Sequence, residues 1–215
     1  DTPVVHYFAK EWVQIGFDVR VIHYRSVFPS IFYFFARIFK SVLKKVFKTD
    51  FIPYSKLNQR VEYEQNEIKI ISQPIFKIFP HFKFFDKTIE KHAKLISKDN
   101  LAIGFIPDII IGHFINPQLP LINKLKTYYP NVKTSLVFHE NPNVINSLFG
   151  NKASEYLKNC DYLGFRFLEM KNTFVNIFGE NHGLNFHVNH LSHFQGHHQV
   201  NDVTNVQCHV EYLQQ

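Results

Sequence analysis

Three side chains suited to acid–base or anion-binding chemistry recur at equivalent places in this sequence. His113, His139 and Arg166 each come directly after a short run of mostly apolar residues. A histidine with an unperturbed pKa near ~6.5 can donate or accept a proton at neutral pH. An arginine can make two parallel hydrogen bonds to a phosphate or a carboxylate. Such a set could bind and orient a polar substrate and move a proton on it.

The same three loops carry further polar groups. Asn116 follows His113, and Glu140 and Asn141 follow His139. A single histidine after an apolar run is more often structural than functional. Two histidines and an arginine at equivalent positions favour a shared site, although the structural interpretation stays open.

The apolar runs are short enough to be strands. We predict strands over Asp108–Gly112, Val132–Phe138 and Tyr162–Phe165, with helices over Leu119–Thr127 and Ala153–Asn159 between them. This alternation implies parallel pairing through right-handed crossovers, and therefore an α/β fold with a Rossmann-like, doubly wound, mostly parallel sheet. The carboxyl ends of such strands hold ligands, so the polar residues should meet at one edge of the sheet.

The rest of the first 179 residues fits the same architecture. The pattern predicts a helix with Val5, Phe8, Trp12 and Ile15 on one face, a strand over Val19–Tyr24, a hairpin of Arg60–Glu64 and Glu67–Ser72, a helix over Phe82–Ser97, and a helix with Phe167, Met170, Phe174 and Ile177 on one face. Gly16 and Gly179 are placed to end the first and last of these helices.

The segment Val27–Phe47 has a different pattern, in which apolar and basic residues are combined. Apolar side chains including Phe34, Phe35 and Ile38 gather on one side at helical spacing. Four basic residues border that side: Arg37, Lys40, Lys44 and Lys45. This pattern is typical of a helix that docks on an anionic membrane surface, and equally of an ordinary helix that faces the core.

Composition limits the class of protein. With 215 residues, 45% of them apolar, the chain can bury a substantial core as one domain. Two cysteines exclude a disulfide scaffold. Neither a secretory signal nor an apolar run of ~20 residues is visible. We therefore expect a cytoplasmic protein, either free or peripheral at the inner face of the membrane.

The chain changes character toward its C-terminus. Residues 1–171 contain all 24 Lys and Arg, whereas residues 172–215 contain none and hold seven of the 13 histidines. Chance, a low-complexity tail or a stretch read from another reading frame would each explain this change. We therefore divide the chain into a domain over 1–183 and an atypical His/Gln-rich tail over 184–215. Four tail histidines have spacings that could hold a metal, but we expect only adventitious binding: His190, His193, His197 and His198.

Familiar catalytic motifs are missing from the sequence. It contains no G-x-G-x-x-G, G-x-x-x-x-G-K-[ST], G-x-S-x-G or C-x-x-C motif. This disfavours a self-contained dinucleotide enzyme, a P-loop NTPase and a serine hydrolase. A pI near 9.2 with 24 Phe and ten Tyr would suit nucleic-acid binding, but the aromatic residues lie mostly at core-like periodic positions. We expect no nucleic-acid partner.

Four segments resemble the N-terminal domain of family-4 retaining GT-B glycosyltransferases. DIIIGHFINP (Asp108–Pro117) resembles the strand followed by H-x-x-x-P in that family, and SLVFHEN (Ser135–Asn141) resembles the strand-then-His element after it. DYLGFRFLEMKNTF (Asp161–Phe174) resembles the next strand with its arginine loop, and HYFAKEWVQIGFDVRVI (His6–Ile22) the first helix and second strand. Together they frame about residues 3–180 and imply one half of a GT-B fold.

The resemblance implies a hexosyltransferase that moves a sugar from a nucleotide-sugar donor to a glycan or lipid-linked acceptor in bacterial polysaccharide or glycolipid synthesis. The N-terminal domain of this family binds the acceptor, and a C-terminal domain holds most contacts to the donor. His113 and His139 would be catalytic. Asn116, Glu140, Asn141 and Arg166 would bind substrate. Neither a cofactor nor a metal is expected, because basic side chains and a helix N-terminus balance the diphosphate charge.

The sequence also departs from the family. The first strand with its Gly-rich loop and the C-terminal donor domain are not found in it. We therefore expect the 215-residue chain to show no transferase activity alone, and its sheet to have an open strand position that favours pairing with another chain. The alternatives are a basic module that binds a membrane surface or nucleic acid, a nucleotide-sugar epimerase of the same architecture, and an inactive fragment that keeps the fold.

Overall fold

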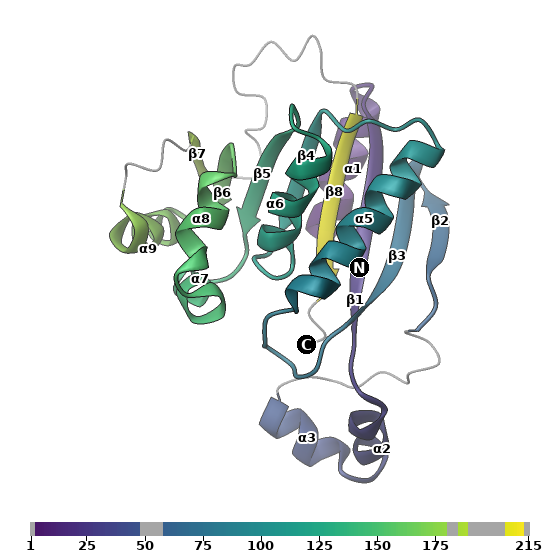
Figure 1. Cartoon of the computed structure of the whole chain (residues 1–215), viewed down its shortest axis with the longest axis vertical. Helices are drawn as coiled ribbons and strands as arrows, with labels where there is room; N and C mark the ends of the chain where they lie inside the picture. Colours follow the sequence, from purple (N-terminus) through teal and green to yellow (C-terminus); the bar gives the residue numbers. More distant parts are fainter. Residues whose placement is uncertain (1–2, 48–57, 180–184, 189–204, 213–215) are drawn as a thin grey trace.

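A computed structural model describes residues 3–47, 58–179, 185–188 and 205–212 (Figure 1). Within them eight strands form one sheet in the order β2-β3-β1-β8-β4-β5-β6-β7. The strands are β1 (Asp18–Val27), β2 (Val61–Gln65), β3 (Ile68–Phe76), β4 (Ile109–His113), β5 (Lys133–Phe138), β6 (Tyr162–Phe165), β7 (Asn185–Val188) and β8 (Asn205–Tyr212). Neighbouring strands are parallel except β2 and β3.

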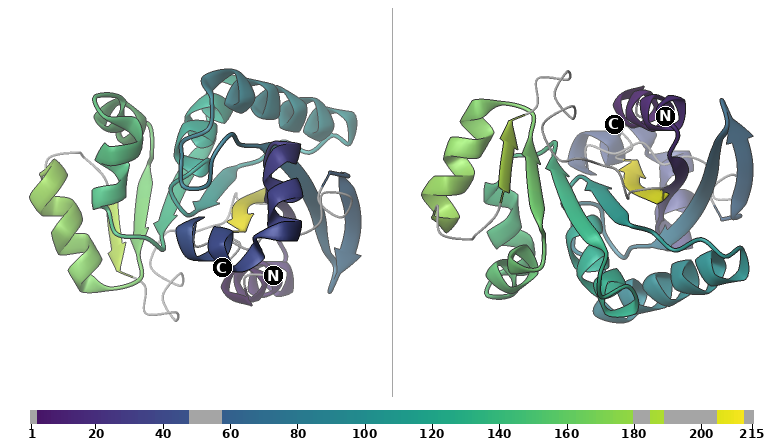
Figure 2. Two further views of the ribbon diagram at one scale, coloured as in Figure 1. Left: turned by 90° about the horizontal axis from the view of Figure 1, so that it is seen from below. Right: turned by 90° about the horizontal axis from the view of Figure 1, so that it is seen from above.

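Helices cover both faces of this sheet (Figure 2). The helices are α1 (Pro3–Gln14), α2 (Ser30–Ile38), α3 (Lys40–Phe47), α5 (Asp86–Ala102), α6 (Gln118–Tyr128), α7 (Asn143–Phe149), α8 (Lys152–Lys158) and α9 (Leu168–Phe178). Figure 2 shows α1 on one side of the strands and α5 and α6 on the other. The predicted α/β class with a doubly wound, mostly parallel sheet is confirmed.

Two apolar cores follow from this layering. Under α1, Ala9 and Trp12 pack with residues of β1, β3, β4 and β5, including Val21 and Ile111. On the opposite face, α5 to α9 enclose a larger core around Leu136 and Phe174. Of the four residues predicted to form the apolar face of this first helix, Val5 and Trp12 are buried. Ile15 is exposed because α1 ends at Gln14 and the chain turns at Gly16, whose φ is +97°.

The strand position that we expected to be open is filled. β8 lies between β1 and β4 and pairs with both in parallel, so that Cys208 is level with Val21 on one side and Ile111 on the other. A strand in this position gives the backbone groups of both neighbours hydrogen-bond partners. β7, from the same stretch after Gly183, extends the other end of the sheet beside β6.

The hairpin of β2 and β3 confirms the predicted pair and extends it. Its two-residue loop is Asn66-Glu67, and both residues have positive φ, as the type I′ turn requires. β3 continues past the predicted end at Ser72 to Phe76. Pro74 fits there because β2 pairs only as far as Ser72, so its missing N–H can face the unpaired side.

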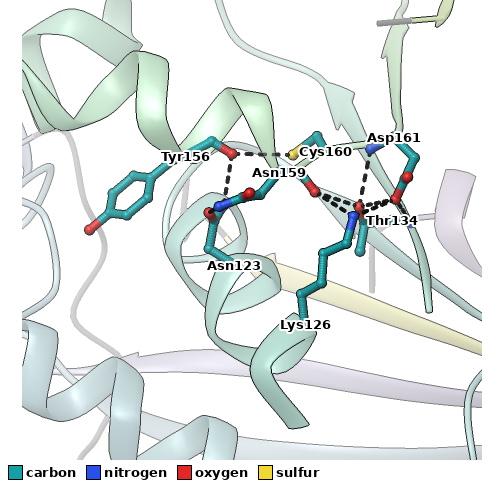
Figure 3. Close-up of polar contacts among 7 residues, drawn as sticks. All are labelled: Asn123, Lys126, Thr134, Tyr156, Asn159, Cys160 and Asp161. Carbon is teal, nitrogen blue, oxygen red and sulfur yellow. Dashed lines mark hydrogen bonds and ion pairs between the residues drawn. The ribbon is translucent and has the colours of Figure 1, made fainter. Parts of the chain in front are cut away.

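A polar cluster fixes α6 and α8 to the amino ends of β5 and β6 (Figure 3). One carboxylate oxygen of Asp161 accepts hydrogen bonds from Lys126 Nζ at 2.8 Å, from Thr134 N at 2.9 Å and from Thr134 Oγ1 at 2.8 Å. Asn123 donates to the carbonyl of Tyr156 at 2.8 Å. The cluster lies at the edge of the sheet opposite to the loops after β4 and β5, and it joins helices to strands.

Candidate functional site

Two histidines meet at the carboxyl edge of the sheet. His113 is the last residue of β4, and His139 follows β5 directly. The Nδ1 atom of His113 lies 3.1 Å from Nε2 of His139, so one ring donates a hydrogen bond to the other. Adjacent parallel strands produce this contact, because Val137 of β5 is level with His113 and the chain then places His139 just beyond it.

Aromatic rings hold the histidine pair in place. Phe114 stacks on His139 with ring centroids 4.5 Å apart, and Phe8 of α1 lies 6.2 Å from His113. Phe114 has a φ of +72°, a region that bulky residues rarely adopt. Its N–H donates to the carbonyl of Val137 at 3.0 Å, which anchors this turn to β5.

Burial keeps both histidines neutral. It lowers the pKa of His113 to about 3, with a further contribution from His139, and the pKa of His139 to about 4, with a further contribution from Arg166. His113 is only 1% exposed, and its Nε2 atom has no hydrogen-bond partner among the described residues. His139 is half-buried, so a ligand would reach His139 first. At neutral pH the pair can hydrogen-bond a hydroxyl group but carries no positive charge.

Glu140 directly follows His139 in the chain and is mostly shielded from water. Burial raises the pKa of its carboxyl group, while a hydrogen bond from the backbone N–H of Ile115 and the charges of Lys77 and His81 lower it. Lys77 is itself buried, with Nζ 4.7 Å from the ring centroid of Phe84. A carboxyl group in such surroundings can accept a hydrogen bond from a ligand hydroxyl or exchange a proton with it.

The other predicted site residues have different surroundings. Asn116 donates from Nδ2 to the carbonyl of Phe82 at 3.0 Å, and its Oδ1 is buried without a hydrogen-bond partner in the part of the chain described. Asn141 accepts from the backbone N–H of Asn143 at 3.0 Å, which occupies its side chain at the start of α7. Arg166 is exposed, with its guanidinium 5.3 Å from the ring centroid of Phe167.

The four predicted membrane-docking residues lie away from the histidine pair. The segment Val27–Phe47 forms α2 and α3 rather than one continuous helix. Arg37 of α2 and Lys45 of α3 are exposed. Lys40 and Lys44 belong to α3, and the positions of their side chains lie outside the described part of the structure.

Sequence reasoning missed Lys77 and Phe114. Lys77 directly follows the carboxyl end of β3, so the rule that found the histidines applies to it, but the predicted strand ended too early. The stacking of Phe114 on His139 depends on a backbone turn that no local pattern predicts. No group of three or more potential metal ligands occurs within the described ranges. The tail histidines at 190, 193, 197 and 198 lie outside those ranges.

Comparison with known proteins gives only a distant similarity, to solved structures. No protein-family model matches the chain, and no curated protein sequence does so either. Among solved structures the chain is similar to one described as trehalose-6-phosphate from E. coli bound with UDP-2-fluoro glucose, with 16% identity and a TM-score of 0.42. The match covers 73% of this chain and 42% of that chain. This chain therefore corresponds to about two fifths of the length of that protein, and our functional proposal rests on its own residues.

Proposed function

We propose that this chain is the acceptor-binding half of a GT-B glycosyltransferase, of the family-4 retaining type. The observation that carries the proposal is the neutral, hydrogen-bonded His113–His139 pair at the carboxyl edge of a parallel sheet, where such folds bind ligands. Two of the four segments that resemble that family, Asp108–Pro117 and Ser135–Asn141, contain the two histidines. The proposed reaction transfers a hexosyl group from a nucleotide-sugar to a glycan or lipid-linked acceptor in bacterial polysaccharide or glycolipid synthesis, at the cytoplasmic face of the membrane.

The two histidines take different roles under this proposal. His139, the more accessible ring, contacts an acceptor hydroxyl. His113 holds the orientation and tautomer of His139 through the 3.1 Å contact. Because burial lowers the pKa of both rings, they orient hydroxyl groups by neutral hydrogen bonds over the physiological pH range.

Under this proposal Glu140 and Asn116 complete the acceptor side, and the exposed Arg166, whose charge acts on His139, binds a phosphate. Asn141 contributes through the turn that begins α7. The donor nucleotide would be held mainly by a second, C-terminal domain acting as the partner of this one, without metal or other cofactor. The transfer itself would then require both halves.

Saccharide binding by the 215-residue chain tests the proposal. We would screen glycans, lipid-linked saccharides and nucleotide-sugars by saturation-transfer NMR, and measure the affinity of the best ligand for the wild type and for His139→Ala. Loss of one hydrogen bond to a hydroxyl should weaken acceptor binding by roughly tenfold. The matched control is His6→Ala, which removes a half-buried histidine away from the site that contacts Asn66 on the hairpin.

Equal affinities of both variants for the saccharide, or binding of no saccharide at all, would contradict the acceptor role. Turnover of a nucleotide-sugar by the chain alone would contradict the proposal that donor binding needs a second domain.

A further inference from the structure

A solvent-exposed apolar surface lies at the same edge of the molecule as the histidine pair. α2 follows the carboxyl end of β1, and residues 76–85 follow the carboxyl end of the parallel strand β3. Figure 1 shows α2 and α3 beyond this end of the sheet. Phe32 of α2 and Phe79 have ring centroids 5.7 Å apart, and Phe79 lies 5.8 Å from Phe82, so the two segments form one surface.

The apolar stripe of α2 points away from the core. Ile31, Phe34, Phe35 and Ile38 share one side of the helix at helical spacing, and all four are exposed. The interpretation of this segment as a core-facing helix is therefore wrong for that stripe. Tyr33, on the opposite side, is buried.

Residues 76–85, like α2, combine exposed aromatic side chains with a buried one. Phe79, Phe82 and Phe85 are exposed, whereas Phe84 between them is buried under Lys77. The buried residue fixes the loop to the body of the domain and leaves its neighbours in solvent. An exposed surface with this many large apolar side chains is unusual for a protein that works alone in solution.

The charge of α2, α3 and residues 76–85 indicates which kind of partner binds this surface. Residues 30–47 and 76–85 contain six Lys or Arg residues and no Asp or Glu. Two copies of the chain packed through this surface would bring like charges together. Aromatic and aliphatic side chains bordered by basic residues instead fit the interface of a bilayer that contains anionic lipids.

We infer that α2, α3 and residues 76–85 together form a docking surface for an anionic lipid bilayer, with Phe82 and Lys83 of the loop as contact residues in addition to the basic helices. The surface is joined to the site, because Asn116 donates a hydrogen bond to the carbonyl of Phe82 at 3.0 Å. Docking turns the carboxyl edge of the sheet toward the lipid headgroups. Presentation of a lipid-linked acceptor to His139 rests on the proposed function, whereas the docking does not.

Vesicle binding by the full chain tests the inference. We would compare sedimentation with vesicles of phosphatidylcholine alone and of phosphatidylcholine mixed with phosphatidylglycerol. The partition coefficient should rise steeply with phosphatidylglycerol and fall with salt. Lys83→Gln should lower it roughly fivefold and Phe82→Ser roughly tenfold. The matched controls, Lys98→Gln and Leu101→Ser, change exposed residues near the far end of α5 and should change it less than twofold.

A measurement on the unaltered chain removes any dependence on how the variants fold. Hydrogen exchange with and without anionic vesicles should show new protection in residues 30–47 and 76–85, and none in residues 98–106. Partition that is independent of phosphatidylglycerol, equal effects of the loop and control variants, or protection that grows with protein concentration in the absence of lipid would each overturn the inference. Vesicle binding without saccharide binding would leave the docking surface intact and refute the acceptor role alone.

Discussion

Histidine burial is the dominant electrostatic feature at the scale of single residues. His23 and His92, like His113 and His139, are shielded from water, and burial lowers the pKa of each to between about 3 and about 4. Only two of these four rings belong to the candidate site. His92, for example, packs edge-on against the ring of Tyr24 at 5.4 Å. The stability of the folded core is therefore sensitive to acid at several places at once.

This burial predicts a loss of stability in mild acid. An unfolded histidine takes up its proton near pH 6.5, but the folded chain resists protonation down to about pH 4. The unfolded state binds more protons in that window, so the free energy of unfolding falls as the pH drops from about 6.5 to 4 and stays constant above about 7.5. At pH 5 each such histidine should cost on the order of 2 kcal/mol.

Urea unfolding at pH 5.0 and 7.5 measures this effect. His92→Gln removes one titrating ring away from the candidate site, and its stability should vary less with pH than that of the wild type. Equal unfolding free energies of the wild type at the two pH values would contradict the prediction.

The site residues show what sequence can and cannot supply at this scale. His113 and His139 could be identified because each directly follows a strand that its own apolar run predicts. The pairing of their rings follows once those strands are parallel neighbours. Lys77 was not predicted as a site residue because β3 continues through Pro74, and a proline usually marks the end of a predicted strand. The orientation of Phe114 depends on a tertiary contact and has no local signal.

At the scale of elements, Asp161 is the main link between helices and sheet away from the site. Burial alone would raise the pKa of its carboxyl group, but the hydrogen bonds from Lys126 and Thr134 outweigh this effect and lower it. Asp161→Ala leaves the Thr134 N–H and Lys126 without their acceptor. The variant should unfold with ~2–3 kcal/mol less free energy in urea titrations at pH 7.

Glu90→Ala is the matched control for this substitution, since it removes a carboxylate whose partners, Lys124 and Tyr128, are exposed. Exposed ion pairs contribute little to stability, so its loss should be clearly smaller. If the two variants lost equal stability, Asp161 would not be the link that Figure 3 indicates.

Strands and helices whose apolar residues recur at a clear spacing could be predicted from the sequence. One strand with such a spacing, β8, was not predicted. The strands around the site and the hairpin agree with their apolar patterns to within a few residues, apart from the end of β3. β8 also carries a strand pattern, because Val206, Cys208, Val210 and Tyr212 alternate with polar residues. Residues 184–215 were predicted to be an atypical tail because of their composition, which is rich in His and Gln and contains no Lys or Arg. The position of β8 between β1 and β4 could not be derived, since pairing over such a sequence distance leaves no local signal.

At the scale of the whole molecule, β8 decides whether the sheet is continuous. Without it, β1 and β4 each expose a row of unpaired backbone groups in the centre of the domain. A chain that stops at Gly183 should therefore lose cooperative unfolding or form oligomers, as measured by urea titration and analytical ultracentrifugation.

A single substitution in β8 refines this test. Cys208→Pro removes a backbone donor from a central strand and should destabilise the chain by ~3 kcal/mol or more. Cys208→Val keeps the donor and favours extended structure, so it should leave the sheet intact. If both variants and the shortened chain matched the wild type, residues 205–212 would not be part of the sheet.

The place of β8 in the sheet also governs when the domain can form during synthesis. The two strands that flank it leave the ribosome long before residues 205–212 do, and they must wait with their inner edges unpaired. Such long-range pairing slows folding and prolongs the exposure of apolar surface to chaperones. Among the strands described, the one made last is thus the one that joins the two halves of the sheet, and this domain can complete its core only after residues 205–212 have been synthesised.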